Sequence, residues 1–227
     1  KRGLNVVLFF YVWKMKKYFY LLFTILISCT KTFKLQEGDL LFQDLDSSPL
    51  CDAIELVTPG YNGANFSHIG LVVLDNDTLK VLEAIPPKVM ITNLDDFINR
   101  SFDKNGNPKV IVGRLKKEFT NSISNAVSYS KSKLEITYDE VFLINNETYY
   151  CSELIYEAFL NDSIFELKPM TFLHPKTKDT LKIWKEYYSD LNTNIPEGNP
   201  GINPGIMSLS NKIEMVHFYG IPDGLNN

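Results

Sequence analysis

Two β-rich runs separated by a short polar cluster constrain the fold of this chain more than any other feature. The runs are residues 65–74 and 79–85, and the polar cluster is residues 75–78. This pattern is typical of a β-hairpin, because turn residues lie between two segments of strand composition. A two-residue loop at the centre of the cluster pairs Leu74 with Leu79. The sequence therefore predicts an antiparallel strand pair with a defined register.

The predicted hairpin places a histidine and a glutamate on one face of the sheet. Because side chains alternate between the two faces of a strand, His68 and Gly70 share a face. In the register set by the two-residue loop, Gly70 lies opposite Glu83, so Glu83 is a diagonal neighbour of His68. Glycine leaves room for a hydrogen bond between them. A three-residue loop would turn Glu83 to the opposite face, so this interpretation depends on the turn.

A second feature is a cysteine at the predicted start of an amphipathic helix. Cys151 precedes apolar residues at helical spacing, and Asn145, Asn146 and Thr148 upstream are candidate N-caps. Unpaired N–H groups and the helix dipole favour a thiolate at such a position and can bind an oxyanion. A thiol, an imidazole and a carboxylate together form a nucleophilic site. The alternative is that Cys151 is a small apolar residue of the core.

A second cysteine rivals Cys151 on the same reasoning. Cys51 follows the possible caps Ser47 and Ser48 and opens its own apolar helical pattern. In an exported protein the two cysteines could also form a disulfide, which would remove the nucleophile. Spacing alone does not choose between these alternatives.

Five short motifs follow one another in a distinctive order. They are Gly38-Asp39-Leu40-Leu41-Phe42, Phe66-Ser67-His68-Ile69-Gly70, Leu82-Glu83-Ala84, Tyr138-Asp139 and Tyr150-Cys151-Ser152-Glu153-Leu154. This ordered set resembles the YaeF/YiiX group of permuted papain-like cysteine hydrolases in the NlpC/P60 superfamily. In that group, as in this chain, the histidine hairpin precedes the cysteine helix.

The resemblance implies an α+β fold in which an antiparallel sheet packs against helices. It also implies roles for individual residues: Cys151 matches the nucleophile, His68 the base and Glu83 the residue that orients the imidazole. Tyr138 matches a tyrosine near the family's site, and we interpret it as a substrate-binding residue. Cys51 falls outside the matched cysteine motif, and we interpret it as a packed structural thiol.

The N-terminal region resembles the signal peptide of a bacterial lipoprotein. Met15-Lys16-Lys17 supplies a basic start, residues 18–27 supply an apolar segment, and Leu26-Ile27-Ser28-Cys29 is similar to a lipobox. We expect translation to start at Met15 and a lipid to be attached at Cys29. The predicted location is the bacterial cell envelope, with the catalytic domain outside the cytoplasm and attached to the membrane by its lipid.

The predicted organisation is an N-terminal apolar region over residues 1–29 and a single hydrolase domain over residues 30–227. The alternative for the first region is a transmembrane anchor. Lys14, Lys16 and Lys17 interrupt its apolar runs, and charges are costly in the bilayer core. The sequence therefore favours the lipoprotein.

Composition excludes several protein classes. A content of 44% hydrophobic and 13% aromatic residues excludes a disordered chain. A formal net charge of −4 without a basic stripe disfavours nucleic-acid binding. The three histidines and three cysteines lack the paired spacing of a zinc site, so we expect neither a metal nor a cofactor.

The predicted function is hydrolysis of an amide or ester bond through a Cys-His-Glu site. The resemblance to the superfamily suggests peptidoglycan peptides, other small peptide or amino-acid amides, and acyl lipids as substrates. Two alternatives stay open. An acyltransferase would pass the acyl group of the same thioester to an alcohol or amine, and a lipid- or peptide-binding lipoprotein would carry the site without turnover.

Outside the motifs, hydrophobic periodicity predicts further elements. They are strands at residues 38–42 and 110–112 and helices at residues 50–57, 121–134 and 180–188. The last of these is expected to be an aromatic-rich surface helix.

Overall fold

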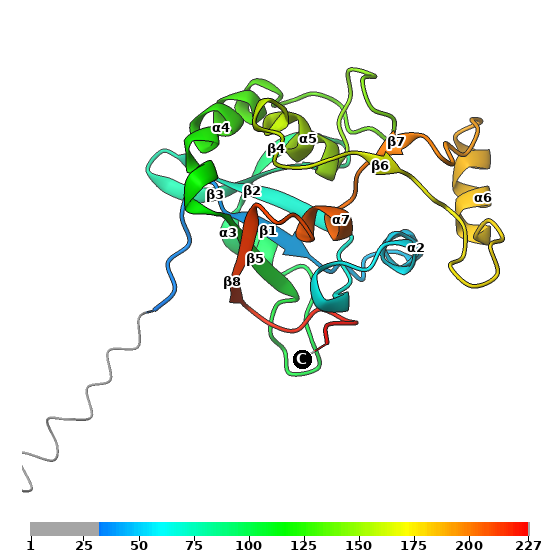
Figure 1. The fold of residues 1–227 in the computed structure, drawn as a ribbon, viewed down its shortest axis with the longest axis horizontal. Helices are drawn as coiled ribbons and strands as arrows, with labels where there is room; N and C mark the ends of the chain where they lie inside the picture. The colour runs from blue at the N-terminus through cyan, green and yellow to red at the C-terminus, as the bar shows by residue number, and fades with distance from the viewer. Residues whose placement is uncertain (1–31, 227) are drawn as a thin grey trace, which may run out of the picture. The chain divides into compact units, whose positions relative to one another are not determined.

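Six antiparallel strands form the central sheet of the computed structural model, which describes residues 32–226 (Figure 1). Their order across the sheet is β4-β3-β2-β1-β5-β8. The strands are β1 (Leu40–Gln43), β2 (His68–Asp75), β3 (Thr78–Ile85), β4 (Lys88–Asn93), β5 (Val110–Leu115) and β8 (Ile213–Phe218). Two short strands, β6 (Lys168–Pro169) and β7 (Pro200–Gly201), pair with each other separately.

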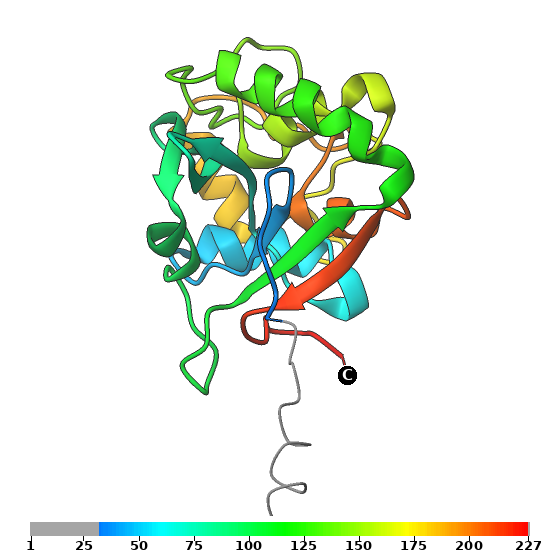
Figure 2. The same ribbon diagram turned by 90° about the vertical axis from the view of Figure 1, so that its left-hand side faces the viewer.

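Helices α4 and α5 lie on one side of this sheet (Figures 1 and 2). The helices are α2 (Pro49–Val57), α3 (Leu94–Ile98), α4 (Ile123–Ser132), α5 (Cys151–Ala158), α6 (Lys182–Asp190) and α7 (Pro204–Ser208). Short 3₁₀ turns occur at Tyr61–Gly63, Lys117–Ser122 and Leu160–Asp162. An antiparallel sheet packed against helices confirms the predicted α+β class.

The β2–β3 hairpin has the predicted register. Leu74 pairs with Leu79, and Asn76 and Asp77 form the loop with φ angles of 49° and 59°. Two consecutive positive φ values are those of a type I′ turn, whose twist matches that of the flanking strands. Asn and Asp tolerate this conformation better than most residues, which is why the polar cluster sets the register.

One face of the sheet forms the main core with α4 and α5. Alternate residues of the strands point to this face, and α5 contributes Leu154, Ile155 and Ala158. The strand residues in this core are Leu40, Phe42, Ile69, Leu71, Val73, Leu82, Ala84, Val89, Ile111, Leu115 and Ile213. This packing fixes α5 against β2 and β3.

Helix α3 packs against the face that carries His68 and Glu83. A Cβ atom on Gly70 would lie 2.3 Å from Val81 Cγ1 and 2.9 Å from Phe97 Cε2. Glycine was expected to leave room for the hydrogen bond between His68 and Glu83, and that bond is present. The position of a Cβ atom is also closed by Val81 of β3 and Phe97 of α3. Gly70 therefore permits close packing of α3 over the hairpin.

The other predicted strands and helices are present, and one of them lies in a different environment from the one expected. Strands β1 and β5 and helices α2 and α4 occupy the predicted segments, with a 3₁₀ turn before α4. Helix α6 is not simply a surface helix, because Trp184 and Tyr188 are buried with Ala53 of α2 and Phe172. The aromatic residues that marked the segment form a second, smaller core.

The predicted lipobox and Cys29 lie outside the described residues. Among residues 32–226, none of the helices combines the length and apolar character that a membrane span requires.

The crowding at Gly70 leads to a stability prediction. Substitution of Gly70 by Ala should lower the free energy of unfolding by about 1–3 kcal/mol, the usual effect of overpacking a filled core. The measurement is urea-induced unfolding. Adding Val81→Ala, which removes the nearer clashing methyl group, should recover part of the loss, and an unchanged midpoint in Gly70→Ala would contradict the packing argument.

Candidate active site

The hairpin brings His68 and Glu83 into direct contact. His68 is the first residue of β2, and its Nε2 lies 2.6 Å from Oε2 of Glu83 on β3. Both side chains are buried, and Glu83 has no exposed surface. The register predicted from the turn therefore gives the predicted hydrogen bond.

The start of α5 brings Cys151 to the same imidazole. Cys151 is the first residue of the helix, and its side chain makes a hydrogen bond with His68. Because Nε2 is bonded to Glu83, the ring presents Nδ1 to the sulfur. The structure thus brings together the three residues predicted for the site, although their spacing in the sequence places only two of them near each other.

The helix is capped differently from the prediction. Tyr150 is the N-cap, and its backbone N–H donates to the carboxylate of the third helical residue, Glu153, at 3.4 Å. The expected cap Asn146 instead accepts hydrogen bonds from the backbone N–H and hydroxyl of Thr148, which closes a local turn upstream. The side chain of Ser152 donates to the carbonyl of Ile202 and ties the helix start to the segment before α7.

The electrostatic environment favours an imidazolium at His68. Burial alone would lower the pKa of His68, but its hydrogen bonds to Cys151 and Glu83 outweigh burial and raise the pKa to about 9. Burial likewise would raise the pKa of Glu83, but hydrogen bonds from Arg100 and His68 lower it to about 2. At neutral pH the pair is therefore an ion pair.

Two further residues complete the surroundings of Glu83. Thr92 of β4 donates to Oε1 at 2.5 Å, and Arg100 after α3 contacts both carboxylate oxygens at 2.6 and 2.7 Å. Neither residue was predicted, because both lie in the connection between the motifs. One signal was available: a carboxylate predicted to face a core requires a cationic partner.

Tyr138 lies beside the thiol, in agreement with its predicted proximity. Its backbone N–H donates to the carbonyl of Pro87, and the next residue bonds to the carbonyl of Tyr149, just before α5. Burial and the neighbouring Cys151 raise the pKa of Tyr138 well above its usual value. Its hydroxyl therefore stays protonated and is available as a hydrogen-bond donor.

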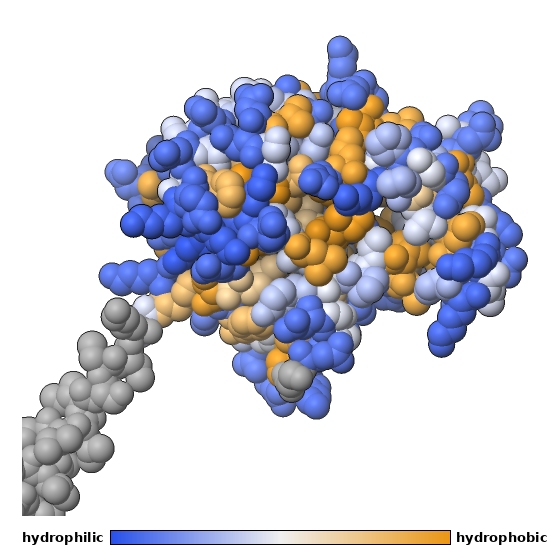
Figure 3. All heavy atoms as spheres, viewed as in Figure 1, coloured by the Kyte–Doolittle hydropathy of each residue, from blue (hydrophilic) through white to orange (hydrophobic). Residues whose placement is uncertain are grey.

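A largely apolar pocket opens beside Cys151. Figure 3 shows apolar side chains gathered in the middle of this face, around the β6–β7 and α7 region. The apolar residues that line the pocket include Ile54, Val57, Phe142, Met170, Phe172, Trp184, Ile202, Pro204 and Ile206. Ser67 and Ser152 at its margin are hydrogen-bonded to backbone atoms of the protein. The pocket therefore offers mainly apolar contact to a bound group.

One acidic cluster among residues 32–226 has the spacing of a cation site. Oxygen atoms of Asp44, Asp46 and Asp223 lie close together, but the ammonium of Lys109 lies among them at 3.0, 2.6 and 3.2 Å. The lysine already supplies the positive charge that these carboxylates require. Cys51 and Cys151 are both free thiols, so the disulfide alternative is not realised.

Comparison with known proteins identifies the family. A model of permuted papain-like amidases, the YaeF/YiiX or C92 family, matches residues 34–217. The chain belongs to this family. The crystal structure of the metalloprotein YiiX from Escherichia coli O157:H7 is similar, with a TM-score of 0.69 and 23% identity. The match covers 84% of this chain and 100% of that chain, whereas no functionally curated protein matches.

The shifted pKa values predict how the ion pair contributes to stability. Glu83 stabilises the fold above pH 4.5, its usual pKa, and this contribution is lost as the pH falls through 2. His68 stabilises the fold below pH 6.5, and its contribution is lost as the pH rises through 9. The pair is therefore most stabilising between these usual values.

Substitution of Glu83 by Gln should cost about 3 kcal/mol near pH 5.5, because it leaves two cationic side chains without their buried partner. The difference in unfolding free energy between the parent and the variant should narrow towards pH 9. Urea-induced unfolding across this pH range measures it, and a pH-independent difference would argue against the ion pair.

Proposed function

We propose that this protein is a cysteine hydrolase that cleaves an amide or ester bond, with Cys151 as nucleophile and His68 as base. Glu83 orients the imidazole. The observation that carries the proposal is the hydrogen-bonded series from Glu83 through His68 to Cys151 at the start of α5. Membership in a family of papain-like amidases supports this chemistry.

The proposed reaction starts from a thiolate at Cys151 and an imidazolium at His68. The thiolate of Cys151 adds to the substrate carbonyl carbon, and the π electrons of the carbonyl move to its oxygen. The imidazolium of His68 gives its proton to the leaving amine or alcohol as the bond breaks, which leaves a thioester. Neutral His68 then takes a proton from water, the hydroxide attacks the thioester, and the thiolate departs with the acid released.

Two donors are placed to stabilise the oxyanion. The backbone N–H of Cys151 belongs to the first turn of α5, where N–H groups have no partner within the helix. We assign the second role to Tyr138, whose hydroxyl stays protonated, and with it the predicted contact with the substrate. Each donor of this kind contributes roughly 10²–10³ in rate.

The pocket beside Cys151 supports a substrate with an apolar group near the scissile carbonyl. Its lining favours an acyl chain or an apolar side chain over a charged wall peptide. We also propose that the protein is a lipoprotein of the bacterial cell envelope, anchored at Cys29, where acyl lipids and peptides are both available.

Thiol reactivity tests the nucleophile without knowledge of the substrate. At pH 6, where an ordinary thiol is well under about 1% ionised, iodoacetamide should alkylate Cys151 faster than Cys51. Burial predicts the opposite order, because Cys151 is only 7% exposed and Cys51 is half-buried. Peptide mass spectrometry measures both rates.

Two variants serve as controls for this labelling. His68→Gln should abolish the preference for Cys151, because it removes the cation that stabilises the thiolate. Cys51→Ser should leave the labelling of Cys151 unchanged. Equal slow labelling of both cysteines in the parent protein would overturn the nucleophile assignment.

Turnover separates hydrolysis from the alternatives. A panel of N-acyl amino acids, acyl esters, amino-acid amides and wall peptides is incubated with the protein, and released products are identified by mass spectrometry. Cys151→Ser should lose at least about 10³-fold in turnover while binding survives, and Glu83→Gln should lose less. Cys51→Ser should retain full turnover.

The other outcomes are distinct. Acyl transfer to an added alcohol or amine, in preference to water, would replace hydrolase by acyltransferase. Binding of an apolar substrate without any product, unchanged in Cys151→Ser, would support a binding lipoprotein instead.

A further inference from the structure

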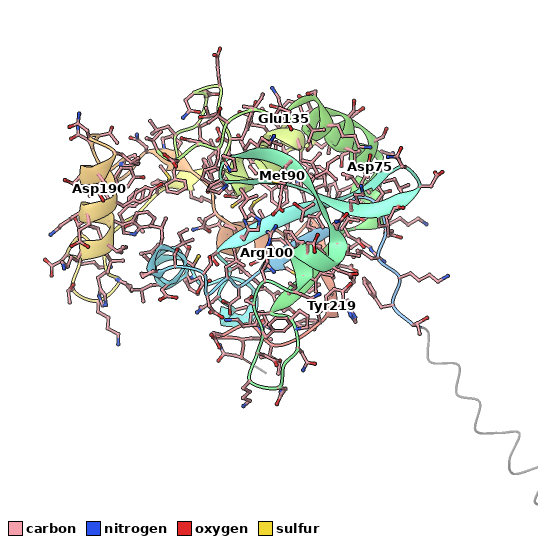
Figure 4. The ribbon with its side chains drawn as sticks, turned by 180° about the vertical axis from the view of Figure 1, so that it is seen from behind. Asp75, Met90, Arg100, Glu135, Asp190 and Tyr219 are labelled. Atoms are coloured by element: carbon pink, nitrogen blue, oxygen red, sulfur yellow. The ribbon has the colours of Figure 1, made fainter. Side chains whose placement is uncertain are left out.

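Arg100 holds the carboxylate of Glu83 through two hydrogen bonds. Its two terminal nitrogens contact different oxygens of Glu83, Nη1 with Oε2 at 2.7 Å and Nη2 with Oε1 at 2.6 Å. Figure 4 places Arg100 near the middle of the back of the molecule, below Met90 of β4. This two-point contact fixes the plane of the carboxylate, which a single hydrogen bond would not do.

The hydrogen-bonding capacity of this carboxylate is full. Oε2 accepts hydrogen bonds from Arg100 and His68, and Oε1 accepts hydrogen bonds from Arg100 and Thr92. A carboxylate offers about four acceptor positions, so the four donors occupy all of them. The carboxylate of Glu83 consequently has one plane in which every donor is satisfied, and in that plane one oxygen is directed to His68.

The segment that supplies Arg100 also supports the imidazole. The guanidinium lies over the ring of Phe97 at 5.0 Å, and the same ring lies 5.6 Å from the ring of His68. Residues three apart in the chain therefore contact both members of the ion pair. Movement of this segment would disturb His68 and Glu83 together.

We propose that Arg100 is a positioning residue of the catalytic site, which acts through Glu83 by fixing its orientation and sharing its negative charge. The inference rests on the proposed function. The side-chain contacts of Arg100 are with Glu83 and Phe97 rather than with the thiol, so its effect should appear at His68. Sharing the charge limits how strongly Glu83 favours the imidazolium, and the imidazole keeps the ability to release its proton to the leaving group.

The surrounding charges determine the sign of the effect. Glu83 faces His68 of β2 and Arg100 after α3, while Thr92 of β4 is uncharged; His68 also faces Cys151 of α5. Loss of one opposite charge raises a carboxyl pKa by about 1–3 units, which leaves Glu83, now at about 2, ionised above pH 6. Without Arg100 the full charge of Glu83 acts on His68, so the pKa of His68 should rise.

The test is an NMR titration of the imidazole in a Cys151→Ala background, where the thiol no longer titrates with it. His68 is one of three histidines and is assigned by its loss in His68→Gln. Arg100→Met and Arg100→Gln should each raise the pKa of His68 by about one unit, at the lower end of the effect of a nearby charge. Arg100→Lys keeps the charge and should leave it nearly unchanged, whereas Glu83→Gln should lower it.

Arg114 provides a matched control. It pairs with Asp39 through two contacts of 2.7 Å. The side chain of Arg114 is 26% exposed and that of Arg100 is 22% exposed, and the carboxylate partner of each is fully buried. Asp39 precedes β1 at the end away from Gln43, the partner of His68. Arg114→Met should therefore lower thermal stability about as much as Arg100→Met without moving the His68 titration.

Each outcome decides the proposal. A raised pKa of His68 in both neutral variants supports it, and Arg100→Gln, which retains a hydrogen-bond donor, serves if Arg100→Met does not fold. An unchanged or lowered pKa, or the same shift in Arg114→Met, overturns it and leaves Arg100 a structural residue. Failure of the proposed function itself would appear separately, as absence of preferential Cys151 alkylation in the parent protein.

Discussion

The burial of an ionised carboxylate at Glu83 is the constraint on which the rest of the site depends. Removing a carboxylate from water costs several kcal/mol unless nearby charges and hydrogen bonds replace the lost hydration. Here the replacement comes from β2, β4 and the segment after α3, whose side chains converge on one residue of β3. The sheet edge and α3 must therefore be correctly assembled before the imidazole has its partner.

The sequence predicts the part of this arrangement that is local. The register of the hairpin follows from two turn residues that accept positive φ angles, and the register alone sets His68 beside Glu83. Arg100 could not be chosen in the same way. A buried glutamate demands a cation, but the chain has 23 lysine and arginine residues, and no spacing rule selects one that is brought near by a later helix. The contact between Cys151 and His68 was likewise predicted from a family resemblance rather than from spacing.

The helices were easier to predict than the elements against which they pack. Periodicity located α2, α4 and α6, but it did not reveal that Trp184 and Tyr188 of α6 pack against Ala53 of α2. The pocket beside Cys151 depends on that packing, because its walls come from α2, α6 and the segments around β6 and α7. Helix α2 and segments more than a hundred residues later in the chain thus build one apolar surface, which hydrophobic periodicity within each segment does not reveal.

Comparison of two charge networks in the protein shows why an arginine suits the site. Lys109 is a compact charge and contacts three carboxylates from different directions, which joins the start of β5 to Asp223 near the C-terminus. Arg100 is planar, and its two nitrogens match the two oxygens of a single carboxylate. A lysine at this position could neutralise Glu83 but would not offer two parallel N–H donors to its two oxygens. The planar contact helps to hold Oε2 towards His68, so a residue that does not bond to the imidazole contributes to its geometry through the shared carboxylate.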